Sequence, residues 1–287
     1  MAREGSLEER IAAYSGSFSR KRKRLAHFIL SNKYYVSVAS AGQVGKQVGA
    51  SAATVVRFAQ SLGYEGYSQL QAAVREELPG YLTALERMGE RLAVLPPSGD
   101  IPQQVFHTDI INIERTASSL SPVEFEAALD AIVDADRILV VGCGLSAPAA
   151  LFLAHSLRVI GFDARAALDG GLAQLVDAAH LDPSMLVIAI DLWRYARSTV
   201  ELANAARHHG AAVIAITDSA VSPLAQVADY AFEAATDGVA HSLSLTALMS
   251  LLNVFVAALS YRVPEQTVES LRRVDMAYRK SKLLLTE

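Results

Sequence analysis

Five short apolar runs, each about one helix-length from the next, constrain the fold of this chain more than any other feature. The runs are residues 138–141, 162–167, 185–190, 212–217 and 230–233. Runs of this length that alternate with helical patterns are typical of a parallel sheet, because each crossover between parallel strands needs a helix. Residues 103–287 are therefore predicted to form a doubly wound α/β domain with helices on both faces of the sheet.

The first 80 residues have a different pattern, of short helices separated by glycines, which predicts an all-α domain. Pro79 and Gly80 interrupt this pattern. We expect residues 81–102 to hold a helix that ends near Val94, followed by a proline-rich linker over residues 96–102.

Two consecutive helices with a tight turn are predicted inside the all-α domain. Ser40 can cap the first helix, Gly49 is suited to its end, and Ser51 can cap a second helix that ends at Leu62 and Gly63. The apolar stripe of the second helix comprises Val55, Phe58, Ala59 and Leu62. Its opposite face comprises Ala53, Val56, Arg57 and Gln60. This pattern indicates a helix-turn-helix, whose second helix lies in the major groove of DNA.

The charge of the chain is unevenly distributed. Residues 1–80 hold 11 Lys and Arg against 6 Asp and Glu, whereas residues 81–287 hold 15 against 24. Residues 1–80, the head, are therefore basic, and residues 81–287, the body, are acidic. This distribution indicates that the head binds a polyanion, so double-stranded DNA is the predicted partner. The basic run 20–24 is open to two interpretations, a contact with phosphates or a solvated helix face.

Seven residues of the head are candidate DNA contacts. Arg57 can reach a guanine or a phosphate, and Gln60 can reach an adenine or the backbone. The alternative for Arg57 is an ordinary surface arginine. The full set is Arg22, Lys23, Ser51, Ala53, Thr54, Arg57 and Gln60.

The head resembles that of RpiR-type transcriptional regulators. Residues 43–67 read QVGKQVGASAATVVRFAQSLGYEGY, and the family has an S-x-x-T-V-x-R-F helix followed by L-G-[FY]-x-G-[FY]. Gly45 stands where the family usually has alanine, a difference expected to cost about 1 kcal/mol of helix stability.

The loop after the first run of the body is a candidate anion site. Residues 142–147 read GCGLSA and precede a helix that is expected to end near Ile160. Glycines allow a tight turn, and free N–H groups at a helix start favour an anion. Three interpretations stay open: a sugar-phosphate-like ligand, a structural turn, or a dinucleotide, since the spacing also fits G-x-G-x-x-[GA]. Asp163 and Asp169 match the acidic residue of that fingerprint only in part.

Residues 103–284 resemble a sugar isomerase (SIS) domain, which RpiR-type regulators carry behind their head. The resemblance rests on residues 142–146 (GCGLS), 210–218 (GAAVIAITD), 222–225 (SPLA) and 228–229 (AD). It implies a phosphorylated sugar bound at the carboxyl ends of the strands. It also implies a homodimer or homotetramer formed through the apolar helix of residues 243–259, because SIS domains bury that helix between protomers.

One segment departs from the SIS pattern. The family reads S-x-S-G-x-T after the third strand, whereas residues 191–199 read DLWRYARST. Arg194 and Arg197 add positive charge that suits a phosphate or carboxylate, or they pair with surface acids such as Glu201. The ligand is therefore expected to be a small anion. The candidate ligand residues are Gly142, Gly144, Ser146, Arg194, Arg197, Ser198, Thr199 and His241.

No spacing in the sequence compels a catalytic residue, a metal site or a cofactor. Isomerisation needs a positioned carboxylate or histidine, and His208 and His209 look like a helix-end pair. The single cysteine excludes an intramolecular disulfide, and no apolar leader opens the chain, so a cytoplasmic protein is expected. Residues 243–259 are short for a membrane span. The favoured function is a ligand-responsive regulator; the alternatives are an SIS isomerase with an accessory helical domain and a ligand-binding module whose head contacts protein.

Overall fold

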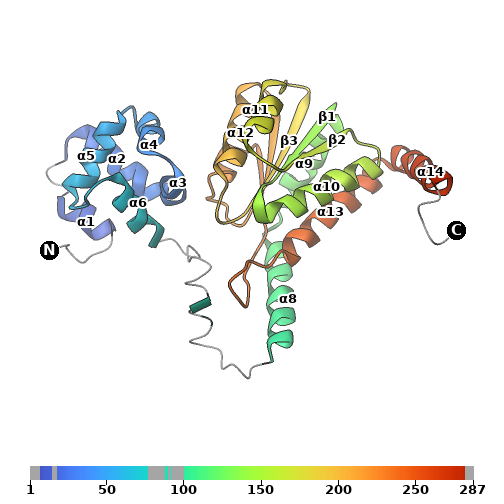
Figure 1. Cartoon of the computed structure of the whole chain (residues 1–287), viewed down its shortest axis with the longest axis horizontal. Coiled ribbons are helices and arrows are strands. Elements are labelled where there is room, and N and C mark those ends of the chain that lie inside the picture. The colour runs from blue at the N-terminus through green and yellow to red at the C-terminus, as the bar shows by residue number, and fades with distance from the viewer. Residues whose placement is uncertain (1–6, 15–17, 77–87, 90, 92–99, 282–287) are drawn as a thin grey trace. The chain divides into compact units, whose positions relative to one another are not determined.

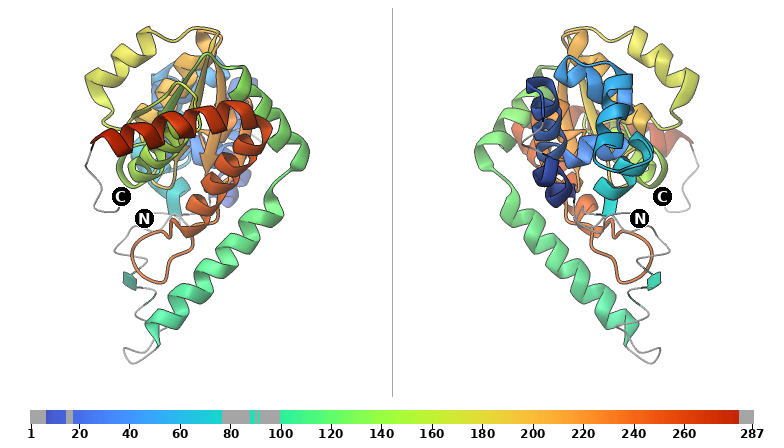
Figure 2. Two further views of the ribbon diagram at one scale, coloured as in Figure 1. Left: turned by 90° about the vertical axis from the view of Figure 1, so that its right-hand side faces the viewer. Right: turned by 90° about the vertical axis from the view of Figure 1, so that its left-hand side faces the viewer.

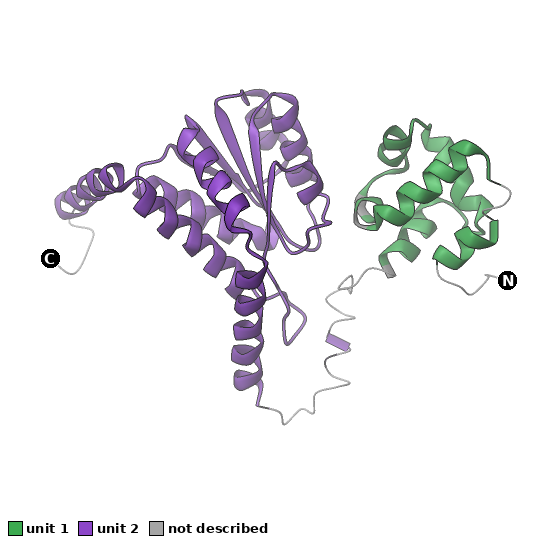
Figure 3. Ribbon diagram, turned by 180° about the vertical axis from the view of Figure 1, so that it is seen from behind, with its two compact units in different colours: residues 1–87 green, residues 88–287 purple. Residues whose placement is uncertain are grey.

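The computed structural model of the chain describes residues 7–14, 18–76, 88–89, 91 and 100–281. The chain divides into two compact units, residues 1–87 and residues 88–287 (Figure 3). Each unit is described by itself. The helix and linker predicted between residues 81 and 99 lie mostly outside the described residues.

Unit 1 is all-α, as the sequence predicts. Its described helices are α1 (Leu7–Tyr14), α2 (Arg20–Ser31), α3 (Lys33–Val38), α4 (Ala41–Val48), α5 (Ala52–Ser61) and α6 (Tyr67–Glu76) (Figure 1). Ser40 and Gln43 form a capping box at α4, and Ser51 accepts a hydrogen bond from the backbone N–H of Thr54 at the start of α5. These caps supply partners for N–H groups that a helix start leaves unpaired, which fixes where α4 and α5 begin.

Helix α6 ties the head together through the carbonyls at the end of α3. Tyr67 Oη donates to Ala39 O over 2.9 Å and lies 3.1 Å from Val36 O. Gln71 Nε2 donates to the same two carbonyls, over 2.8 and 2.9 Å. Burial raises the pKa of Tyr67 above its usual range, so its hydroxyl stays a donor. The core of the head includes Leu25, Ile29, Val44, Val55, Phe58 and Leu70.

Unit 2 contains a five-stranded, fully parallel sheet in the order β2-β1-β3-β4-β5. The strands are β1 (Arg137–Val141), β2 (Ala164–Ala167), β3 (Met185–Asp191), β4 (Ala212–Thr217) and β5 (Tyr230–Glu233). The helices are α8 (Ile101–Ser119), α9 (Pro122–Asp134), α10 (Ala147–Val159), α11 (Gly171–Ala179), α12 (Arg197–His208), α13 (Thr246–Arg262) and α14 (Pro264–Ser281), with the short 3₁₀ turns η2 (Gly144–Ser146) and η3 (Ala225–Val227). Figure 2 shows α8, in green, extending away from the sheet.

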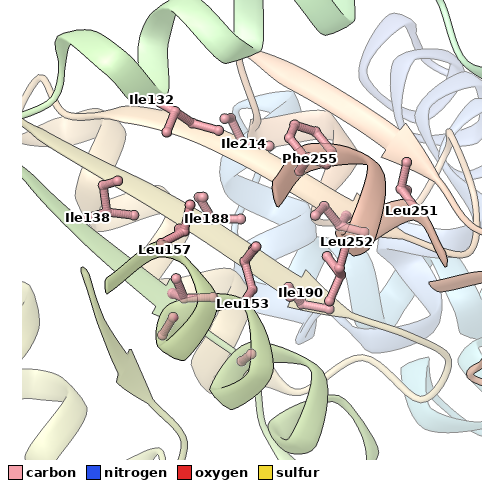
Figure 4. Close-up of a cluster of buried hydrophobic side chains, with 14 of the residues drawn as sticks. Ile132, Ile138, Leu153, Leu157, Ile188, Ile190, Ile214, Leu251, Leu252 and Phe255 are labelled. Carbon is pink, nitrogen blue, oxygen red and sulfur yellow. The ribbon is translucent and has the colours of Figure 1, made fainter. Parts of the chain in front are cut away.

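The sheet is covered on both faces, which confirms the doubly wound prediction. Ile138, Ile188 and Ile190 point to the face covered by α9, α10 and α13 (Figure 4). Their neighbours Leu139, Val187 and Ala189 point to the opposite face, which α12 covers and Ala178 of α11 borders. Alternate residues of a strand face opposite sides, so a strand buried on both faces is apolar throughout.

Two expected boundaries differ from the structure by two residues. The linker was expected to reach Pro102, but α8 begins at Ile101 with Asp100 as its N-cap, because proline is tolerated in the first helical turn. The second strand was expected from Phe162, but β2 begins at Ala164. Phe162 instead donates its N–H to Leu157 O and closes the end of α10.

Helix α13 is a core helix of unit 2. It buries Ala247, Leu248, Leu251, Leu252, Phe255 and Leu259. Among the described residues, no single helix has the length and apolar character needed to cross a membrane, although α13 and α14, bent by 106°, meet that test as a pair.

Candidate functional site

The strand order places a reversal point between β1 and β3. The chain leaves β1 to pair β2 on one side and then crosses to β3 on the other. In open parallel sheets, ligands bind outside the carboxyl ends of the strands at such a point, because the loops diverge there and leave a crevice. The segments that leave β1 and β3 are therefore the first place to look for a site.

The loop after β1 is shaped by two glycines. A Cβ on Gly142 would lie 2.9 Å from both Ala150 Cβ and Ser146 O, so the glycine lets α10 approach the strand closely. Gly144 has φ +57°, a left-handed conformation that side chains disfavour. The turn η2 then leads into α10, and Ser146 is buried at that helix start.

Residues from three loops meet at this point. Cys143, after β1, has its Sγ 3.7 Å from Ser198 Oγ in the first turn of α12. A Cβ on Gly170, in the loop after β2, would lie 3.1 Å from Ser198 Oγ and 3.5 Å from Gln174 Oε1. Gly170 therefore keeps open a small space between Ser198 and Gln174.

Two buried polar side chains beside this space lack partners. Gln174 is 6% exposed and Thr199 is fully buried. In the part of the chain that the structure describes, no hydrogen-bond partner is found for Gln174 Oε1, Gln174 Nε2 or Thr199 Oγ1. In native proteins most buried polar atoms have a hydrogen-bond partner. Unpaired atoms at the carboxyl edge of the sheet therefore indicate a ligand or an ordered water.

The segment between β3 and α12 is held by two buried carboxyl groups. Asp191 Oδ2 accepts a hydrogen bond from Ala196 N over 2.6 Å. Asp218, after β4, accepts from Trp193 N over 3.1 Å and from Tyr195 Oη over 2.8 Å. Burial raises the pKa of both carboxyls, that of Asp191 well above its usual range. Both groups thus fix the path of the loop that leads to Ser198.

The head presents α5 as a candidate recognition helix. Ser51, Ala53 and Arg57 are exposed along α5, whereas Val56, which the sequence placed on the same face, is partly buried against the head core. Ser51 Oγ lies 2.9 Å from Thr54 Oγ1, so both hydroxyls stand at the start of the helix. Gln60 Nε2 donates to Glu65 O over 3.3 Å.

Comparison with known proteins agrees with this arrangement. Residues 5–80 match the helix-turn-helix domain of the rpiR family, and residues 131–258 match the SIS domain. The sugar isomerase domain of an RpiR transcription factor from Sphaerobacter thermophilus is 40% identical, with a TM-score of 0.61 over 62% of this chain and 99% of that one. The chain belongs to the RpiR family of transcriptional regulators.

Two further relatives resemble this RpiR regulator over most of its length. An uncharacterized HTH-type transcriptional regulator of Haemophilus influenzae is 27% identical over 232 residues, 80% of each protein. The structure of the Vibrio vulnificus NanR protein complexed with ManNAc-6P is 21% identical, with a TM-score of 0.62 over 97% of this chain and all of that one. The predicted fold and family are thereby confirmed.

Five of the predicted ligand residues of the RpiR regulator lie together at the reversal point. They are Gly142, Gly144, Ser146, Ser198 and Thr199. Arg194 and Arg197 lie on the connecting segment and at the start of α12, and both are exposed. Neither arginine forms an ion pair with a described residue, so the expected alternative of a pair with Glu201 is not formed.

His241 is not brought to that site by any contact among the described residues. It is exposed in the segment between β5 and α13. That segment is fastened to α8, because Asn112 Nδ2 donates to Asp237 O over 2.8 Å and Ser244 Oγ donates to Asp109. The cavity of about 490 Å³ between α8 and this segment is mostly apolar, and its charged lining residues are Arg91, Asp109 and Asp237.

The acidic residues of the dinucleotide alternative lie at opposite ends of β2. Asp163 precedes β2, so it stands at the amino edge of the sheet, away from the glycine loop. Asp169 follows β2 at the carboxyl edge and is exposed. Asp163 lies at the sequence distance from the glycines that the dinucleotide fingerprint requires. It stands, however, at the edge of the sheet opposite to the glycine loop.

Gly45 in the head has a packing reason that sequence analysis missed. A Cβ on Gly45 would lie 2.4 Å from Ala50 O, and Ala50 N donates to Gly45 O over 2.7 Å. The glycine therefore lets the turn fold back against α4, and an alanine here requires the turn backbone to move.

Sequence analysis also missed Gln174, Gly170, Asp191 and Asp218. Gln174 falls in a helix of ordinary composition, and its spacing carries no signal. The two aspartates do have a sequence signal, because Asp191 ends an apolar strand and Asp218 directly follows one. Side chains at these positions reach a site at the carboxyl edge of a parallel sheet.

Proposed function

We propose that this regulator binds double-stranded DNA through the exposed face of α5, and that a phosphorylated sugar at the β1–β3 reversal point changes its DNA affinity. The observation that carries the proposal is the contact of Cys143 with Ser198, which brings the loop before α10 to the start of α12. Helix starts and hydroxyl groups favour an anion, and a helix-turn-helix in the same chain supplies the output.

The chemistry of the ligand site supports a phosphate group. Ser146, Ser198 and Thr199 supply hydroxyls near the starts of α10 and α12, and Arg194 and Arg197 supply exposed positive charge on the adjoining segment. Guanidinium groups bind phosphate through two parallel hydrogen bonds, which compensates for the missing S-x-S-G segment. The bound ManNAc-6P in the similar NanR structure is consistent with this ligand class.

A regulator rather than an isomerase is favoured by how the buried acids are used. Proton transfer next to a carbonyl needs a carboxylate or imidazole free to reach the substrate. Asp191 and Asp218 are instead engaged by the N–H groups of Ala196 and Trp193. His241 is exposed on a segment fastened to α8. We therefore propose that the SIS domain binds its ligand without turnover.

On DNA, we propose that the first turns of α5 carry base recognition. Ala53, Thr54 and Arg57 face outward near its start, where recognition helices contact base edges. Ser51, Arg22 and Lys23 are assigned to phosphates, which set register without reading sequence. Gln60 already donates to Glu65 O, so its contribution is smaller.

Self-association of unit 2 is proposed from the exposed apolar residues of α8. Phe106 is 65% exposed and Ile110 is 55% exposed one helical turn later. Two such side chains on one helix face are typical of an interface, and a homodimer would present two heads to a two-fold operator. Sedimentation of a Phe106→Lys, Ile110→Lys variant should give half the wild-type mass, whereas Val123→Lys, at an exposed position of α9, should not.

Calorimetric titration of the full chain tests the ligand proposal. The probes are N-acetylmannosamine 6-phosphate, glucose 6-phosphate, the two unphosphorylated sugars and inorganic phosphate. We expect saturable binding of a phosphorylated sugar and none of its unphosphorylated form. NMR of the same mixtures should show no aldose–ketose interconversion. Turnover would favour the isomerase alternative, and the absence of binding by any phosphate probe would refute the ligand class.

A further inference from the structure

The buried amide of Gln174 is a polar group of unit 2 that the proposed function leaves unused. It is 6% exposed, and both of its polar atoms lack a partner among the described residues. A buried polar atom without a partner costs about 1–3 kcal/mol, and here one side chain carries two of them. This amide therefore forms no hydrogen bond with the described part of the fold.

The amide points toward the same space as Ser198. The position that a Cβ of Gly170 would occupy is 3.5 Å from Gln174 Oε1 and 3.1 Å from Ser198 Oγ. The two oxygens therefore both lie close to the backbone of Gly170, next to the position that a side chain there would occupy. Cys143, 3.7 Å from Ser198 Oγ, borders it on the side of β1.

The chemistry of an amide differs from that of the rest of the site. Hydroxyls and helix N-termini donate to an anion, whereas a glutamine offers one donor group and one acceptor with no charge. Its natural complement is a neutral group that both donates and accepts, such as a sugar hydroxyl or a secondary amide. A charged oxygen alone would leave Oε1 unpaired.

We propose that Gln174 is the specificity-determining contact of the effector site, reading a hydroxyl or acetamido group of the ligand beside the anionic group held at Ser198. This inference rests on the proposed function, since it concerns the same site. It assigns the neutral part of the ligand to α11 and the anionic part to α12.

The test compares full-length wild type with Gln174→Met, which keeps the length of the side chain and removes its hydrogen bonds. Gln226→Met, at an exposed position of η3, is the control for the loss of an amide that donates within the fold, because Gln226 Nε2 donates to Val221 O. For each protein, calorimetry gives the affinity for N-acetylmannosamine 6-phosphate, glucose 6-phosphate and inorganic phosphate. Thermal unfolding gives the stability of the ligand-free protein.

We expect Gln174→Met to lose about tenfold in affinity for the better-bound sugar phosphate, the effect of one lost hydrogen bond, with its affinity for inorganic phosphate unchanged. Its ligand-free melting temperature should equal or exceed that of wild type, because no internal bond is lost. The preference between the two sugars tells which neutral group is read.

Three results would overturn the inference. A ligand-free melting temperature lowered by several degrees would show a structural role for Gln174. An unchanged ratio of sugar-phosphate to phosphate affinity in Gln174→Met would show that the amide does not read the ligand, while the proposed function would stand. The failure of wild type to bind any of the three probes would refute the proposed function and the inference together.

Discussion

Cys143 Sγ and Ser198 Oγ lie 3.7 Å apart although 55 positions separate them in the sequence. The contact exists because β1 and β3 are neighbours in the sheet, so the segments that follow them leave the same edge. It marks the place where the loop after β1 meets the start of α12, which is where we propose that the effector binds.

Gly170→Ala should weaken binding of the phosphorylated sugar. The new methyl group would lie 3.1 Å from Ser198 Oγ and would fill the space between Ser198 and Gln174. Gly171→Ala is a control for replacing a glycine of positive φ, +65° against +63°, because no atom lies within 4 Å of its added methyl. Both variants should lose stability from backbone strain, and Gly170→Ala should lose more, because φ +63° and ψ −160° is a region essentially restricted to glycine.

Only Gly170→Ala should lose ligand affinity, by about tenfold or more as measured by calorimetry. Equal losses of affinity in both variants would mean that strain in the loop after β2, and not occupation of the space, governs binding.

Asp191→Asn should make stability less dependent on pH. Burial raises the pKa of Asp191 well above its usual range, so the folded state holds its proton more tightly than the unfolded state does. As pH rises from the unfolded pKa toward the folded one, the unfolded state loses its proton first and the protein loses stability. Asparagine cannot titrate, and its Oδ1 can still accept from Ala196 N.

Urea unfolding between pH 4 and 8 measures this effect. The wild type should lose stability with rising pH more steeply than Asp191→Asn, and the control Asp169→Asn, exposed at the same edge of the sheet, should follow the wild type. Parallel curves for wild type and Asp191→Asn would count against a buried, protonated Asp191.

Tyr67→Phe should destabilise the head by about 1–2 kcal/mol. The hydroxyl donates to the carbonyls at the end of α3, and its loss leaves Gln71 as their remaining side-chain donor. Amide hydrogen exchange should rise in α3 and α6. Tyr278→Phe, at a 46% exposed position of α14, should leave exchange in the head unchanged.

Lys23→Ala should weaken DNA binding to a similar extent on all sequences. Lys23 is exposed on α2, and a lysine that contacts a phosphate releases about one counterion on binding. The slope of log affinity against log salt should therefore fall by about 1. An unchanged slope would support the solvated-face interpretation of the basic run.

The elements of unit 2 follow from sequence because its strands are buried on both faces and read as continuous apolar runs. Strands β4 and β5 have the predicted bounds, Ala212–Thr217 and Tyr230–Glu233, and each of the other runs overlaps its strand. The second run begins two residues early, because Phe162 is apolar for a different reason: it covers the end of α10.

The helix-turn-helix can also be predicted from the sequence, because its helix caps involve residues that are close together in the chain. Ser40 and Ser51 cap residues only three positions away. The partners of Asp218 and the burial of Gln174 are set by loops that meet only in the folded sheet. Arg194, Arg197 and His241 were assigned by residue type and proximity in sequence, and their exposed side chains leave those assignments as proposals.

The central claim is that an effector in unit 2 alters DNA binding by α5. Fluorescence anisotropy on DNA from upstream of the protein's own gene tests it, with wild type and Arg57→Ala, across a salt series, with and without the phosphorylated sugar that binds. The account predicts salt-sensitive wild-type binding at about 10 nM or tighter, a loss of about 10- to 100-fold in Arg57→Ala, and a shift in affinity when the sugar phosphate is present. The absence of DNA binding by folded wild type at low salt would contradict the account. An affinity that is the same in wild type and Arg57→Ala and does not change with the sugar phosphate would also contradict it.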